Sequence, residues 1–164
     1  MKTKYIILTL IFGILAITNC VDAQKNNETM KITKIKYRFG DSSVPPPYHR
    51  SYSVVLTKDS LHIVVDSYGD IISDTIFTID SLQFDTIVAN IDKFKINKCK
   101  LQKNEGCTGG TSKSLYLYEN DKEILSGYKY YCGGEIYGDM CGDLKLFATE
   151  IKKLIPDLKA LLKK

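Results

Sequence analysis

Apolar and polar residues alternate over several short stretches of this chain, and such alternation is typical of half-buried β-strands. The stretches are rich in β-branched and aromatic residues, which favour an extended backbone. Turn-forming residues such as Tyr68-Gly69-Asp70 separate them. The pattern predicts about seven strands, at residues 30–39, 51–56, 61–65, 71–79, 96–101, 114–118 and 123–130.

Two other stretches repeat their apolar residues at helical spacing. The first covers residues 81–93, and it follows Asp80, which together with Gln83 forms a capping-box pattern. The second covers residues 143–164 and has an apolar stripe with lysines opposite. Pro156 interrupts it, and since proline lacks a backbone donor, it should kink this helix or begin a new one.

The order of these elements predicts an α+β fold. Its main part is an antiparallel sheet of about seven strands, with one inserted helix and a C-terminal helix packed on one face. Residues 24–164 are expected to form a single α+β domain, because this length suits one hydrophobic core. The C-terminal helix could instead lie on a membrane, but its stripe is ordinary for a helix that packs on its own sheet.

The N-terminal residues resemble a secretory signal peptide. Lys2 and Lys4 precede an apolar run that is too short to span a bilayer comfortably. Cleavage after Ala23 would leave residues 1–23 as the signal peptide. In a competing interpretation the segment ending at Cys20 is an imperfect lipobox, and a lipid on Cys20 anchors the protein to a membrane. Either way the protein is expected to be exported, to the periplasm or beyond the cell.

Four cysteines lie in the predicted mature chain, and an even number in an exported protein indicates disulfides. Seven residues separate Cys99 from Cys107, and eight separate Cys132 from Cys141. These spacings do not match zinc sites, in which the ligand pairs stand two to four residues apart. The sequence therefore predicts two disulfide staples and no metal site.

A hairpin argument favours one of the three possible pairings. If Asn120 and Asp121 form a two-residue turn, Glu119 faces Lys122. Continuing that register brings Cys107 close to Cys132 on one face of the hairpin. The preferred bridges are then Cys107–Cys132 and Cys99–Cys141, although the glycines near these cysteines can shift the register.

Composition excludes some classes of function. The formal net charge is +4, and the basic residues are scattered along the chain. No basic stripe with interleaved aromatic residues is present, so nucleic-acid binding is not predicted. The glycine-rich segment 107–112 does not match a phosphate loop, and the acidic residues between 135 and 143 do not match an EF-hand. No cofactor is predicted.

The segment 40–50 contains three consecutive prolines and is the first candidate binding site. Such a run is stiff and extended. A rigid loop that presents Asp41, Tyr48, His49 and Arg50 would lose little entropy when a ligand binds. The alternative is a stiff connection that prevents edge pairing, with Arg50 salt-bridged to Asp41.

Tyrosines around the hairpin are the second candidate. The predicted register points Leu115, Leu117 and Ile124 to one face, and Tyr116, Tyr118 and Tyr131 to the other. Tyr137 follows shortly after. An exposed tyrosine face suits recognition of a protein or a carbohydrate, although tyrosine is also simply a good strand former.

These observations favour a small, exported, non-enzymatic binding or inhibitor-like module, with an unknown protein or carbohydrate partner in the envelope or medium. One alternative is a small envelope hydrolase that uses His49, because His62 lies within a strand and is expected to be structural. No nucleophile-elbow sequence supports this alternative. Another is a purely structural protein of the envelope.

Overall fold

The computed structural model describes residues 31–101, 103 and 105–163. The predicted signal peptide, the lipobox and Cys20 lie outside the described residues. No helix in the described part of the chain is long and apolar enough to cross a membrane.

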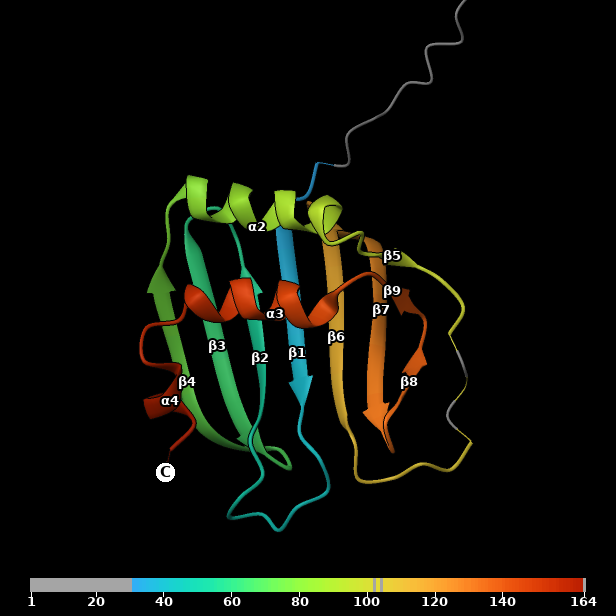
Figure 1. Ribbon diagram of the computed structural model, residues 1–164. Helices are drawn as coiled ribbons and strands as arrows, with labels where there is room; N and C mark the ends of the chain where they lie inside the picture. Colours follow the sequence, from blue (N-terminus) through green and yellow to red (C-terminus); the bar gives the residue numbers. More distant parts are fainter. Residues whose placement is uncertain (1–30, 102, 104, 164) are drawn as a thin grey trace, which may run out of the picture.

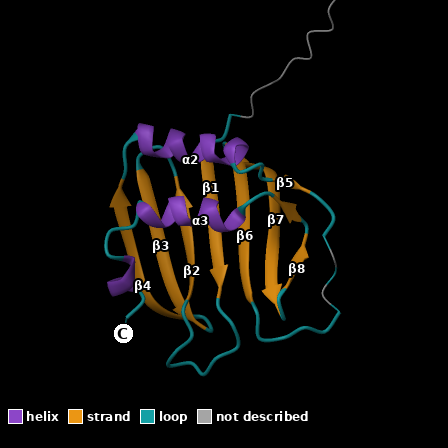
Figure 2. Cartoon of the chain, viewed as in Figure 1, coloured by secondary structure: helices purple, strands orange, loops and turns teal. Residues whose placement is uncertain are grey.

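A seven-stranded antiparallel sheet, ordered β4-β3-β2-β1-β6-β7-β8, forms the body of the molecule (Figures 1 and 2). The first strand of the chain is its middle strand, because the next three strands meander to one side of β1 and three later strands lie on the other. A second sheet pairs β5 with β9. The strands are β1 (Lys34–Gly40), β2 (Ser51–Leu56), β3 (Ser60–Ser67), β4 (Asp70–Thr78), β5 (Asn97–Lys98), β6 (Thr111–Glu119), β7 (Lys122–Cys132), β8 (Glu135–Gly138) and β9 (Met140–Cys141).

The helices begin where the capping residues predict. Helix α2 (Ser81–Lys93) has a complete capping box, in which the Asp80 carboxylate accepts the Gln83 N–H at 2.7 Å. Asp143 caps α3 by accepting the Leu146 N–H at 2.9 Å. Pro156 lies between the last two helices and separates them. These are α3 (Leu144–Lys153) and α4 (Leu158–Leu161).

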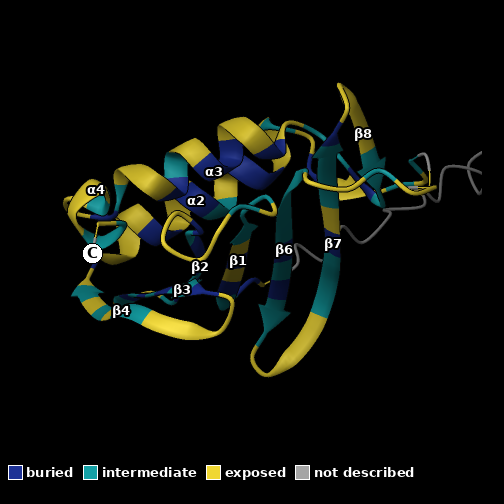
Figure 3. Cartoon of the chain, turned by 90° about the horizontal axis from the view of Figure 1, so that it is seen from below, coloured by how far each residue is buried: buried dark blue, intermediate teal, exposed yellow. Residues whose placement is uncertain are grey.

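Helices α2 and α3 cross the same face of the sheet (Figure 1), and Figure 3 places both on one side of it. Alternate side chains of the strands and the inner stripes of both helices meet there and form a single apolar core. No described helix lies on the opposite face, which we call the open face. The largest fully buried side chains are Tyr37, Phe84, Phe147, Ile35, Leu56, Leu61, Ile63, Leu115, Leu117, Met140, Leu144 and Ile151.

This architecture confirms the predicted α+β class, with an antiparallel sheet, an inserted helix and C-terminal helices on one face. Two strand predictions were too long. The first strand begins at Lys34 rather than at residue 30, and only Asn97–Lys98 of the predicted strand 96–101 is extended. The Cys99 N–H then donates to the Asp139 carbonyl oxygen, so the chain leaves the ladder there and runs along the edge of β8.

The β6–β7 hairpin closes as predicted, with Glu119 opposite Lys122. However, its register shifts by one residue, because Ile124 is an extra residue in β7. Since neighbouring side chains of a strand point to opposite faces, this bulge reverses the expected orientation of the rest of β7. Tyr131 therefore lies on the helix-covered face with Leu117, and its predicted place beside the other hairpin tyrosines was wrong.

Two disulfides staple the fold. Cys99–Cys141 joins the segment after β5 to β9, and Cys107–Cys132 joins the loop before β6 to the end of β7. Their Cα–Cα distances are 5.7 and 6.1 Å. They are the two pairs that the hairpin argument favoured.

Candidate functional site

The proline loop connects β1 to β2 at the lower end of the sheet in Figure 1. The Pro45 carbonyl oxygen accepts the N–H groups of Tyr48, at 2.9 Å, and of His49, at 3.2 Å. The loop is thus curled into a turn rather than extended. Proline supplies no donor, so the first N–H groups after the run are the ones that close the turn, and the φ angle of proline is compatible with it.

His49 is buried inside this loop, with 6% of its surface exposed. Its ring stacks on Tyr68 with centroids 3.9 Å apart. The Tyr68 backbone N–H donates to Nδ1 at 3.3 Å, and Nε2 lies 3.3 Å from the Ser51 hydroxyl. A backbone N–H can only donate, so Nδ1 is the acceptor and the proton of the neutral ring sits on Nε2. His49 therefore donates to Ser51 and is not placed to remove its proton.

Asp41 and Arg50 also hold the loop together, but not through the predicted salt bridge. The Asp41 carboxylate accepts the backbone N–H groups of Ser42 and Arg50, at 2.9 and 2.8 Å. The Arg50 guanidinium instead donates to the carbonyl oxygens of His49, at 2.6 Å, and Leu162, at 2.9 Å. It thereby satisfies an end carbonyl of α4, a position at which cations are favoured.

We expect His49→Ala to lower the free energy of unfolding by about 1–3 kcal/mol, because it removes a buried ring and leaves the part-buried Tyr68 N–H without its acceptor. Tyr48 is the matched control in the same loop, since 75% of its surface is exposed, and Tyr48→Ala should change stability by no more than about 0.5 kcal/mol. Urea denaturation measures both. Equal effects of the two substitutions would contradict the anchoring role of His49.

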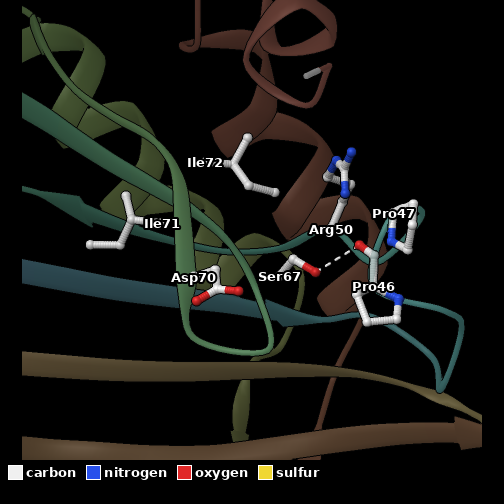
Figure 4. A pocket seen from close by; sticks show the side chains of 7 residues that line it. All are labelled: Pro46, Pro47, Arg50, Ser67, Asp70, Ile71 and Ile72. Carbon is white, nitrogen blue, oxygen red and sulfur yellow. Dashed lines mark hydrogen bonds between the residues drawn. The ribbon is translucent and has the colours of Figure 1, made fainter.

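A hollow of about 490 Å³ lies between the proline loop and the β3–β4 turn (Figure 4). Pro46, Pro47, Ile71 and Ile72 supply its apolar walls, and the Ser67 hydroxyl on its rim donates to the Pro46 carbonyl oxygen at 2.8 Å. Asp70 and Arg50 are its charged residues, and Arg50 is already bonded to two carbonyl oxygens. The hollow therefore offers few uncommitted polar groups to a ligand.

The open face is the stronger candidate. On β1, Lys34 and Lys36 pair across the sheet with Tyr118 and Tyr116 of β6. The Lys34 Nζ lies 4.6 Å from the centre of the Tyr118 ring, and the Lys36 Nζ lies 5.8 Å from that of Tyr116. Both are within the range of cation–π attraction. The structure thus brings two of the predicted tyrosines beside basic residues that the prediction had not included.

One row of paired residues crosses six strands of this face. It combines aromatic, basic and aliphatic side chains, and at ~4.8 Å per strand it spans about 24 Å. From β7 to β4 its members are Ser126, Tyr116, Lys36, Val55, His62 and Ile76. At the β4 end Ile76 is 68% exposed, and His62 Nε2 lies 2.7 Å from an oxygen of Asp74.

A shallow hollow of about 420 Å³ lies at the lower end of the same face. Arg38 and Asp66 stand in it with 4.0 Å between their charged atoms, and the buried ring of His49 borders it. The loop and the open face therefore adjoin each other, although Tyr48 and Arg50 are not among the residues that line this hollow.

Tyr137 lies on the open face as well, but at its far edge. It pairs with Tyr130 between β8 and β7, with ring centres 6.3 Å apart. It also lines a separate hollow beside Cys107. Tyr137 is thus three strands away from β1 and does not join Tyr116 and Tyr118 in one cluster.

Within the described range, no three His, Cys, Asp or Glu side chains are arranged to hold a metal ion. The described cysteines are all bonded in disulfides. No protein-family model, no curated protein and no solved structure matches this chain.

Proposed function

We propose that this protein is an exported, non-enzymatic binding module that holds a protein partner with an acidic surface on its open face. The observation that carries the proposal is the row of half-exposed lysine, tyrosine and aliphatic side chains across the sheet, on the face opposite to the described helices α2 and α3. Tyrosine and arginine are enriched at protein interfaces.

A protein partner fits this face better than a carbohydrate does. A sugar ring stacks on an exposed aromatic face, but lysine ammonium groups lie over the rings of Tyr116 and Tyr118. The faces of these rings are therefore directed at the lysines of β1. The breadth of the row and the exposed Ile76 at its end suit a flat protein surface.

The charge of the face favours an acidic partner. Among the described residues, Lys36 has no carboxylate within salt-bridge distance, and it is exposed. Lys34 pairs with Asp121, whose side chain is fully exposed, and Arg38 lies 4.0 Å from Asp66. The exposed Lys34–Asp121 pair is weak, and the Arg38–Asp66 pair lies at the limit of salt-bridge distance, so both cations remain available to a partner.

Two further observations support the proposal. The bonding of His49 gives it a structural task, which removes the residue on which a hydrolase would depend. The two disulfides are typical of proteins outside the reducing cytosol, as the signal-peptide pattern also indicates. Export to the periplasm or medium, with or without a lipid on Cys20, belongs to this proposal.

Charge reversal on the open face tests it. Residues 24–164 carrying Lys36→Glu should capture a partner from the envelope fraction of the native host at least about tenfold less well than the unmodified chain. Lys159→Glu makes the same charge change on α4, on the helix side, and should leave capture unchanged. Equal capture by Lys36→Glu, or an equal loss with Lys159→Glu, contradicts the proposal.

A further inference from the structure

A second basic cluster lies on the helix side of the sheet, away from the open face. Two aromatic rings form its floor, those of Phe39 on β1 and Tyr131 on β7. The Lys113 Nζ lies 5.6 Å from the centre of the first ring and 4.4 Å from that of the second. From α3, the Lys145 Nζ lies 5.1 Å from the Tyr131 ring, and the Lys152 Nζ lies 6.0 Å from the Phe39 ring.

These three lysines repel one another. None of Lys113, Lys145 and Lys152 has a carboxylate within salt-bridge distance among the described residues. Burial lowers the pKa of Lys113, and the charges of Lys152 and Lys145 lower it further. Three cations that face each other without a counter-charge are unfavourable unless an anion joins them.

The layer of side chains beneath Phe39 does not neutralise this charge. Beneath Phe39 lies Tyr52, with ring centres 5.2 Å apart, and burial raises the pKa of Tyr52 to about 12. The hydroxyls of Tyr52 and Tyr37 find no acceptor outside their own pair among the described residues. This layer therefore supplies neutral phenols and no carboxylate.

One carboxylate, that of Asp143, lies beside the Tyr131 ring at one end of the cluster. Burial raises the pKa of Tyr131, and the charge of Asp143 raises it further. Asp143 caps α3 through the Leu146 N–H, and Glu150 pairs with Lys153 at 2.8 Å. Beside Lys145, a hollow of about 290 Å³ opens between the start of α3 and β7. Asp143 and Lys129 both line it, and the Lys129 ammonium donates to the Gly142 carbonyl oxygen. The hollow has room for one tetrahedral anion next to the cluster.

We propose that Lys113, Lys145 and Lys152 form a binding site for a small polyanion that carries phosphate or sulfate groups. The rings of Phe39 and Tyr131 form the floor of this site. Lys145 and Lys152 stand two helical turns apart, ~10 Å along the axis, so the ligand carries more than one anionic group. Lysines act as point charges that suit tetrahedral anions, whereas planar carboxylates are bound best by arginine, which the cluster lacks.

Titration calorimetry with inorganic tripolyphosphate tests the site on residues 24–164. The unmodified protein should bind it saturably at one site. Lys145→Ala with Lys152→Ala should weaken binding at least about tenfold, the equivalent of one lost charge-assisted contact. Alanine favours helix, so the fold should persist, and circular dichroism checks this. The control double variant, Lys58→Ala with Lys159→Ala, removes the same charge at two exposed positions outside the cluster and should bind as the unmodified protein does.

Three outcomes would overturn the site. One is the absence of saturable binding at millimolar tripolyphosphate, and another is an equal loss in both double variants, which would indicate unspecific attraction. The third is binding to vesicles of anionic phospholipid through Lys145 and Lys152 without binding of tripolyphosphate, because the ligand would then be a membrane surface. Loss of partner capture by Lys36→Glu is a separate result, since that residue lies on the other face.

Discussion

Replacing Cys99 and Cys141 by serine is expected to lower the free energy of unfolding by about 4 kcal/mol. The bridge closes a loop of 42 residues, and a cross-link stabilises a protein by restricting the unfolded chain, more so for longer loops. After β5 the chain is joined to the edge at β8 and β9 by backbone bonds from Cys99 to Asp139 and from Leu101 to Gly138, so this bridge also fastens the chain there. Urea denaturation of the double variant measures the loss.

The second bridge serves as the matched comparison. Cys107–Cys132 closes 25 residues, and replacing both cysteines by serine should cost about 3.5 kcal/mol on the same grounds. Intact mass under non-reducing conditions confirms that the remaining bridge has formed in each variant. A loss below about 1 kcal/mol for either pair would contradict the staple interpretation, because it falls outside the usual effect of a native disulfide.

Phe147→Ala is expected to lower the free energy of unfolding by about 3–5 kcal/mol. Phe147 is fully buried where α3 packs on the sheet, and it is among the largest buried side chains. Truncation removes apolar contacts and leaves a cavity that the neighbouring strands cannot fill.

The neighbouring residue supplies the control. Leu146 lies on the outer side of the same helix and is 49% exposed, so Leu146→Ala should cost no more than about 1 kcal/mol. If the two substitutions had similar effects, α3 would not pack on the sheet by the face described above. Thermal unfolding by calorimetry gives the same comparison independently of denaturant.

Local signals in the sequence predicted much of this fold. The Asp80–Gln83 capping box placed α2 at residues 81–93, where the structure has it. Asn120-Asp121 placed the β6–β7 turn, and Pro156 marked the break between α3 and α4. Each of these features depends on residues within a few positions of one another, so the sequence specifies them directly.

Long-range features could not be obtained in this way. The bulge at Ile124 is one inserted residue that no composition signal marks, yet it moved Tyr131 to the other face. The central place of β1 follows from its pairing with β6, about 80 residues later in the chain. For that reason the sequence predicted only an alternating strand that contains Lys34, Lys36 and Arg38. It did not predict that these side chains share a surface with Tyr116 and Tyr118.

The sequence predicted that the proline loop is extended, whereas the structure shows that it forms a turn. Its prolines restrict the backbone, and the Asp41 carboxylate, the Arg50 N–H and the buried His49 ring are joined by hydrogen bonds within it. However, His49 and Arg50 point their polar atoms at backbone groups of the protein itself. Sequence does not reveal whether a loop side chain faces a ligand or its own turn, because the deciding partners, Tyr68 and Leu162, come from distant elements.

Photo-crosslinking in the native host tests the open-face binding site most directly. Tyr116 is replaced by p-benzoylphenylalanine, which keeps an aromatic side chain on β6, and Leu82, 74% exposed on α2, is replaced in the same way as the control. The open-face account expects one discrete crosslinked protein from position 116 and none from position 82. Crosslinking from position 82 alone, or none from either position, would contradict it.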